Sequence, residues 1–185
     1  MPYIKTIEPN EATNELKEIY SKVVGERGKL SNILKIHSLL PKTMLTHLDL
    51  YKSIMFDKSD LKREDKELIA IVVSSANKCD YCVNHHAEAL KYYWKDDKKV
   101  QQAANDFRKL DLSDKLKSML EFAEKLTLTP GEMNEDDIKI LRQSGFEDAE
   151  ILSLTLITNY FNFVSRNALA LGVEFSEEEV KGYKY

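Results

Sequence analysis

The sequence predicts an all-α protein, and three observations carry that prediction. The 185 residues include only 6 Gly and 4 Pro. Residues with high helix propensity, such as Lys, Glu, Leu and Ala, are frequent throughout. Apolar residues recur at helical spacing in most segments, whereas polar and apolar residues rarely alternate. We therefore expect one domain over residues 1–185, folded as a helical bundle.

The first half of the chain is expected to form four helical segments. In order, their expected starts are Pro9 or Asn10, Pro41, Ser59 or Asp60, and Cys79. The apolar stripe of the first segment contains Leu16, Ile19, Tyr20 and Val23. That of the second contains Met44, Leu45, Leu48, Tyr51 and Met55. That of the third contains Leu61, Leu68, Ile69, Val72, Val73 and Ala76. Gly25 and Gly28 would end the first segment, and Asn77-Lys78 would separate the third from the fourth.

The second half is expected to continue in the same way. The fourth segment ends at Trp94, and two helices follow over Val100–Leu110 and Ser113–Leu128. After a turn at Thr129-Pro130-Gly131, Asn134 should cap a helix that ends at Gly145. The last long helix should cover Phe146–Leu171 and stop at Gly172, before an acidic tail at Glu177–Glu179.

Charge and hydropathy exclude several classes of function. The formal net charge is −4 with both signs mixed, which argues against a nucleic-acid binder. Ile151–Leu171 is long enough to cross a bilayer, but polar residues interrupt it, so a central bundle helix or a subunit interface is favoured over a membrane span. The charged run Lys58–Lys66 is interpreted as a solvated face. The chain does not open with the pattern of a signal peptide, so a cytoplasmic protein is expected.

The two cysteines form a Cys79-x-x-Cys82 pair with two histidines close behind. On a helix that begins near Cys79, residues rotate by about 100° per position, so Cys79, Cys82 and His86 share one face. His85 then lies on a flank. The positive end of the helix dipole favours a thiolate, and His86 lies one turn beyond Cys82 as a possible base. This pattern favours an activated thiol with a resolving thiol beside it.

Glu67 is a further candidate because a tight break at Asn77-Lys78 would fold its helix back against the cysteine helix. Its carboxylate could then orient His86 or pass on a proton. Asn162 and Arg166, one turn apart, are interpreted as a buried hydrogen-bonded pair that could reach the pocket. His37 and His47 have no reactive neighbours in the sequence and are interpreted as structural or surface residues.

Other interpretations of these residues stay open on spacing alone. The cysteines could be ordinary core residues, and Glu67 could be solvated. Cys79, Cys82, His85 and His86 could hold a metal, although four ligands from a single helix make a strained cage. We expect neither a metal nor another cofactor.

Beyond these physical arguments, the motif resembles a known family. Glu67 followed by Cys79-x-x-Cys82-x-x-x-His86 is similar to the signature of alkylhydroperoxidase AhpD-like proteins, within the wider carboxymuconolactone decarboxylase family. The local sequence around the cysteines resembles the branch of peroxidase-related proteins. Looser matches extend along most of the chain, including Asn32-Ile33-Leu34 and Tyr160-Phe161-Asn162.

The resemblance implies an AhpD-like helical bundle built around the cysteine helix, and a thiol peroxidase. By this likeness, the residue matching Cys82 attacks the peroxide and the one matching Cys79 closes the disulfide, while Glu67 and His86 form a proton relay. The family's best-studied peroxidases carry a histidine where this chain has Tyr81, and a phenol does not titrate near neutral pH. Tyr81 and His85 are expected to lie beside the reacting groups rather than to react themselves. An external dithiol reductant and a homo-oligomer, a trimer or hexamer, are also implied.

Three rival functions remain. The cysteine pair could serve a non-catalytic module that senses oxidants or controls an interaction. The chain could be an enzyme of the decarboxylase branch, although that branch normally lacks the cysteine pair. It could also be a zinc protein.

Overall fold

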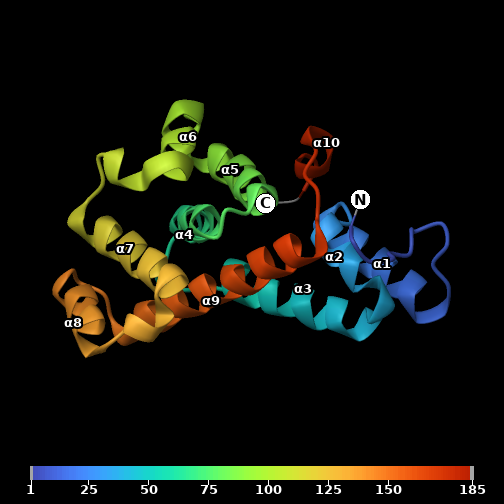
Figure 1. The fold of residues 1–185 in the computed structure, drawn as a ribbon, viewed down its shortest axis with the longest axis horizontal. Coiled ribbons are helices and arrows are strands. Elements are labelled where there is room, and N and C mark those ends of the chain that lie inside the picture. The colour runs from blue at the N-terminus through green and yellow to red at the C-terminus, as the bar shows by residue number, and fades with distance from the viewer. Residues whose placement is uncertain (1, 184–185) are drawn as a thin grey trace.

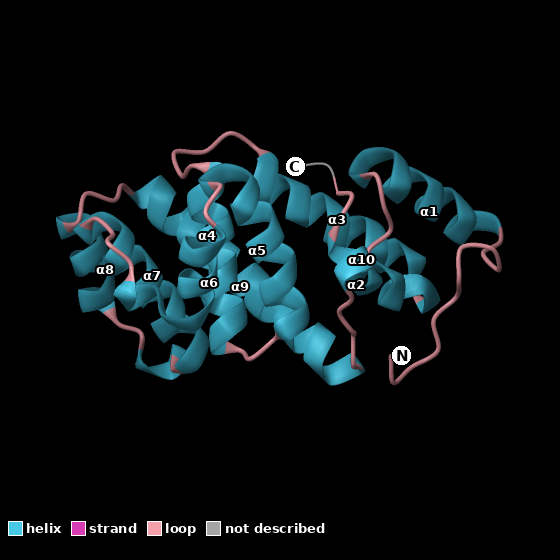
Figure 2. Ribbon diagram, turned by 90° about the horizontal axis from the view of Figure 1, so that it is seen from above, coloured by secondary structure: helices cyan, strands magenta, loops and turns pink. Residues whose placement is uncertain are grey.

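The computed structural model describes residues 2–183 as helices joined by loops, and this part of the chain contains no strand (Figure 2). The expected all-α fold is therefore confirmed. The helices are α1 (Asn14–Arg27), α2 (Asn32–Lys35), α3 (Pro41–Phe56), α4 (Arg63–Ala76), α5 (Asp80–Trp94), α6 (Asp97–Asp106), α7 (Asp114–Leu128), α8 (Glu135–Gln143), α9 (Asp148–Leu171) and α10 (Glu177–Val180), with short 3-10 turns at Ile36–Leu39, Phe107–Lys109 and Pro130–Glu132.

Helix α4 is the centre of the larger core. It packs against α5, α6, α7 and α9, and every residue from Lys66 to Ser74 is buried. A helix that is apolar around most of its circumference is expected only where neighbours cover all sides. Helix α9 runs from the end near α8 through the middle of the molecule, with α3 alongside it (Figure 1). The cysteine helix α5 returns along α4, its most extensive partner.

A second, smaller core joins the N-terminal segments. Side chains of α1, among them Leu16 and Val23, pack against Met44 and Leu48 of α3. Tyr51 contacts both this cluster and the larger one. Because α3 packs against both α1 and α9, it joins the N-terminal helices to the rest of the bundle, and α1 lies at the end of the molecule opposite α8 (Figure 2).

Several boundaries fall close to their expected positions, and the differences have local causes. Asn134 caps α8 with a full capping box, and Gly172 ends α9 in the left-handed conformation at φ 63°. Helix α1 begins at Asn14 because the chain first makes a turn, closed by a 2.9 Å bond from Glu11 N to Glu8 O. Helix α4 begins at Arg63, since the Ser59 hydroxyl bonds to Leu61 O instead of capping a helix.

The prediction of a solvated face over Lys58–Lys66 is wrong at two positions. Lys66 is buried, and its Nζ donates to Ile54 O at 2.9 Å and Asp57 O at 3.3 Å. Arg63 folds inward to Glu67. Both cations satisfy buried acceptors around the α3–α4 connection, which a charge count along the sequence cannot reveal.

The membrane question raised by Ile151–Leu171 also has a structural answer. No helix within residues 2–183 is long and apolar enough to cross a bilayer. Helix α9 instead buries one side against α4 and α7 and leaves apolar side chains such as Leu152 and Phe163 exposed on the other.

Two leucines of α9 provide a matched test of this packing. Leu154 is fully buried, whereas Leu152 is 60% exposed. We expect Leu154→Ala to lower the free energy of unfolding by about 2–5 kcal/mol, because it removes core contacts and leaves a cavity. Leu152→Ala should change it by less than about 0.5 kcal/mol. Urea unfolding followed by circular dichroism measures both, and equal losses for the two variants would contradict the assigned faces of α9.

Candidate active site

The α4–α5 connection places both cysteines at the start of α5. Lys78 takes a left-handed conformation at φ 59°, and Cys79 N donates to Ser74 O at 2.9 Å. Cys79 is the N-cap of α5, and its sulfur accepts a hydrogen bond from Cys82 N at 3.4 Å. Both cysteines are buried and free, so this is the reduced form of the pair. The prediction that a helix begins at the first cysteine is confirmed to within one residue.

The two thiols have opposite tendencies to ionise. A hydrogen bond from the Cys82 thiol lowers the pKa of Cys79, against the opposing effect of burial. The pKa of Cys82 is raised because its thiol donates that bond, because it is buried, and because it faces the negative charge of Cys79. In the resting pair, these interactions favour the negative charge on Cys79. The resemblance to AhpD-like proteins implies that Cys82 is the attacking thiol, whereas the resting electrostatics of the pair favour the charge on Cys79.

Glu67 and His86 meet as the sequence predicted. Glu67 is fully buried on α4, and its Oε2 lies 2.6 Å from His86 Nδ1. Its other oxygen, Oε1, accepts a hydrogen bond from Arg63 Nη2 one turn earlier. Burial alone would raise the pKa of Glu67, but the charge and hydrogen bond of His86, followed by the charge of Arg63, lower it overall. Because Glu67 occupies Nδ1, the other ring nitrogen of His86, Nε2, is left for chemistry.

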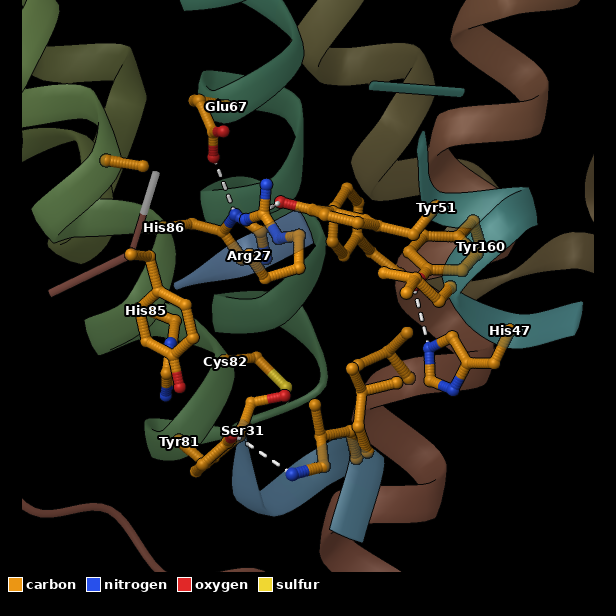
Figure 3. Close-up of a pocket in the computed structure, with 17 residues that line it drawn as sticks. Arg27, Ser31, His47, Tyr51, Glu67, Tyr81, Cys82, His85, His86 and Tyr160 are labelled. Carbon is orange, nitrogen blue, oxygen red and sulfur yellow. Dashed lines mark hydrogen bonds and ion pairs between the residues drawn. The ribbon is translucent and has the colours of Figure 1, made fainter. Parts of the chain in front are cut away.

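One cavity brings Cys82, His86 and Glu67 together. Its volume is about 90 Å³, and Tyr81, His85 and side chains from α1, α3 and α9 complete the walls (Figure 3). A single water molecule needs roughly 10–15 Å³ on the same scale, so a small organic group fits. Cys82 lines this cavity, whereas Cys79 does not. The cysteine that a bound molecule meets is therefore Cys82.

Comparisons with known proteins show which family and fold this chain resembles. The model of the carboxymuconolactone decarboxylase family matches residues 41–125, which include Glu67, both cysteines and His86. A crystal structure from Ralstonia eutropha JMP134, described as an alkylhydroperoxidase AhpD core and an uncharacterised peroxidase-related protein, superimposes with a TM-score of 0.85 and 25% identity over 97% of this chain and 94% of that one. An uncharacterised peroxidase-related protein from Silicibacter sp. TM1040 has a TM-score of 0.84 and 27% identity, over 98% of this chain and 100% of that one.

The chain therefore resembles AhpD-like proteins, and its residues 41–125 match the carboxymuconolactone decarboxylase family. A third solved structure, the debrominase Bmp8, has a TM-score of 0.78 at 19% identity, over 97% of this chain and 98% of that one. That likeness is one of fold alone. A protein with this fold can be a debrominase, so the fold does not by itself determine the substrate.

Tyr81 and His85 are held in this site by a residue near the C-terminus. Tyr81 OH donates to Glu179 Oε1 at 3.0 Å and accepts from Ile33 N at 3.2 Å. His85 Nε2 pairs with Glu179 Oε2. Glu177–Glu179 were expected to form an acidic tail, but Glu179 is buried and connects α10 to α5. His85 lies on the flank of α5, as the helical register predicted, and this flank also faces the cavity.

The predicted Asn162–Arg166 pair is wrong. Asn162 is buried, but its amide is used by other elements: Oδ1 accepts from Asn77 Nδ2 at 2.8 Å, and Nδ2 donates to Thr127 Oγ1 at 3.1 Å. Arg166 is exposed. Neither residue lines the cavity around Cys82. Asn162 instead ties α9 to the end of α4 and to α7, which is a structural role.

His47 was expected to be a structural or a surface residue, and its burial excludes the surface interpretation. His47 is buried, lines the cavity, and its Nε2 lies 2.7 Å from Tyr160 OH. It occupies the same face of α3 as Met44 and Tyr51, which is the one sequence signal that could have placed it inside. The sequence analysis also missed Arg63 as the partner of Glu67. The one indication of that ion pair in the sequence is the spacing of one helical turn between the two residues.

Within residues 2–183, no group of three or more His, Cys, Asp and Glu side chains is arranged to hold a metal ion. The histidines that follow the cysteines are each engaged by a carboxylate, His85 by Glu179 and His86 by Glu67.

The buried ion pair of Glu67 leads to a prediction about stability and pH. Glu67→Gln should lower the free energy of unfolding at pH 7 by about 3–5 kcal/mol, because Arg63 loses its buried counter-charge. The folded-state pKa of Glu67 is lowered, so its stabilisation is present above the unfolded pKa and is lost as the pH falls through the folded pKa. The gap between wild type and variant should therefore narrow in acid.

Urea unfolding at pH 7 and at successively lower pH measures this gap. Glu64→Gln, on the same helix and partly exposed, is the matched control and should cost little at any pH. A gap for Glu67→Gln that stays constant down to acid-induced unfolding would show that its charge is not what stabilises the site.

Proposed function

We propose that the protein is a thiol-dependent peroxidase that reduces hydrogen peroxide or organic hydroperoxides through a Cys79–Cys82 dithiol and disulfide cycle. One observation carries the proposal above all others. Cys82 lines a cavity together with His86, His86 is held by the buried Glu67, and a second thiol lies one helical turn away. The family match and the peroxidase-related neighbours support the same reaction class.

The first step is the formation of a Cys82 thiolate. Its proton can pass to His86, whose Nε2 is available because Nδ1 is bound to Glu67. The hydrogen bond between the thiols offers a second place for a proton, since Cys79 accepts from Cys82 at rest. When the shared proton lies on Cys79, Cys82 carries the negative charge and faces the substrate. Such a pair titrates as a unit rather than as two independent thiols.

The redox steps then follow from the position of the two sulfurs. The Cys82 thiolate attacks the terminal peroxide oxygen, the O–O bond breaks, and the sulfur is oxidised to a sulfenic acid. Cys79 condenses with the sulfenic acid, which forms the disulfide and releases water. An external dithiol reduces the disulfide by exchange and returns both thiols. A cytoplasmic homo-oligomer remains our proposal for the working form.

Two alternatives use the same residues. A redox-sensing or interaction module would form the disulfide but would not turn over. An enzyme of the decarboxylase branch would need neither cysteine. Turnover by the wild type distinguishes a peroxidase from the sensing module, and loss of activity in the cysteine variants distinguishes it from the decarboxylase branch.

Cys82→Ser should abolish hydroperoxide consumption in the presence of a dithiol reductant, because it removes the attacking sulfur. Cys79→Ser should still react once and stop at a sulfenic acid, since no resolving thiol remains. Mass spectrometry after trapping with a 1,3-diketone detects that adduct on Cys82. The reverse pattern, with Cys79 trapped in Cys82→Ser, would overturn the assignment of the attacking thiol. Disulfide formation without turnover in the wild type would favour the redox-sensing module.

A further inference from the structure

A second hydrogen-bonded chain leads from the same cavity to the surface. Tyr160 OH lies 2.7 Å from His47 Nε2, His47 Nδ1 lies 3.0 Å from His37 Nε2, and His37 Nδ1 lies 2.8 Å from Thr43 Oγ1. Tyr160 and His47 line the cavity, and Thr43 is exposed. In Figure 3, Tyr160 and His47 lie on the opposite side from His85 and His86, with the Cys82 side chain between the two sides. The chain therefore links solvent to the cavity without passing through Glu67.

The protons of this chain have two possible orders. Burial lowers the pKa of His47 to about 4 and also lowers that of His37, so both rings are neutral near pH 7. Thr43 Oγ1 lies 2.8 Å from both His37 Nδ1 and Leu40 O. If the Thr43 hydroxyl donates to Leu40 O, each ring donates outward and Tyr160 donates to His47. If the hydroxyl donates to His37, each ring donates inward and the Tyr160 proton is directed to the cavity.

Tyr160 is suited to hold a proton beside a reacting thiol. Its pKa is raised well above the ordinary value, first by burial, then by the charges of Tyr51 and Cys82. The phenol therefore stays protonated near neutral pH. Tyr160 and Cys82 line the same cavity.

The reaction needs such a proton donor. When a thiolate breaks the O–O bond of an alkyl hydroperoxide, the departing oxygen leaves as a strongly basic alkoxide. Protonating that oxygen in the transition state lowers the barrier. His86 is already assigned to remove the thiol proton, so an acid on the opposite side allows both transfers to be in place together.

We propose that Tyr160 donates the proton to the departing oxygen, and that His47, His37 and Thr43 return it from solvent. This inference rests on the proposed peroxidase function. The S–O bond forms, the O–O bond breaks, the sulfur is oxidised by two electrons and the hydroperoxide is reduced to an alcohol. The Tyr160 proton goes to the alcohol. Tyr160 then takes a proton from His47, His47 takes one from His37, and His37 takes one from the Thr43 hydroxyl, which is reprotonated by solvent. The proton that His86 took from Cys82 returns to solvent, which completes the balance.

The test compares two oxidants whose leaving groups differ in basicity. Cumene hydroperoxide releases a basic alkoxide, whereas peroxyacetic acid releases acetate, which needs no proton. The rate constant for oxidation of reduced Cys82 is measured by rapid mixing and quenching, before any reductant acts. We expect Tyr160→Phe to slow the reaction with cumene hydroperoxide about 100-fold and that with peroxyacetic acid less than about threefold.

Two further variants separate proton delivery from structural effects. His47→Gln can still hydrogen-bond to Tyr160 but cannot relay a proton through a ring, so it should show the same selectivity between oxidants with a smaller change. Tyr92→Phe, at an exposed tyrosine of α5, should leave both rate constants unchanged. Circular dichroism confirms that each variant is folded.

The outcomes distinguish this inference from the function on which it rests. Equal slowing with both oxidants in Tyr160→Phe would reduce Tyr160 to a structural role, and no slowing would remove it from the reaction; either result overturns the inference while the peroxidase stands. A wild-type protein whose Cys82 reacts with neither oxidant would overturn the peroxidase and the inference together.

Discussion

The site depends on one buried negative charge. Glu67 has no exposed surface, and an unpaired carboxylate in such a position would be protonated or would destabilise the fold by several kcal/mol. Two partners stabilise the ionised carboxylate of Glu67. They are the Arg63 guanidinium, one turn earlier on α4, and the His86 imidazole on α5. The pair with His86 holds α5 against α4 at one register. That register fixes the position of Cys82, one turn before His86, in the wall of the cavity.

The cavity itself has two chemically distinct sides. On one side, His86 is connected to a carboxylate and is suited to accept a proton. On the other, Tyr160 is connected to two neutral imidazoles and an exposed hydroxyl, and is suited to supply one. Between them lies a thiol with a raised pKa, beside a second thiol with a lowered one. A site with separated proton acceptors and donors fits a reaction in which a thiol loses a proton and a leaving oxygen gains one.

Local patterns predicted the fold and the centre of the site, and long-range contacts account for what they missed. The helical register of Cys79, Cys82 and His86 depends only on neighbouring residues, so spacing was sufficient. Pairing Glu67 with His86 needed a correct inference about a single tight turn. Tyr160 and His47, by contrast, are separated by 113 positions, and Glu179 and His85 by 94. No periodicity relates such residues, and a histidine or an acidic run is usually solvated. Asn162 shows the opposite failure, since its partners are the distant Asn77 and Thr127 rather than Arg166 one turn away.

The central claim, that the cysteine pair converts a hydroperoxide to an alcohol, is tested most directly with the reduced wild-type protein and one equivalent of cumene hydroperoxide. Intact-mass analysis, peptide mapping and quantification of the alcohol are made on the same sample. The account predicts one equivalent of cumyl alcohol and an intramolecular Cys79–Cys82 disulfide, with a mass lowered by two hydrogen atoms. Unconsumed hydroperoxide and two thiols that remain free would contradict it.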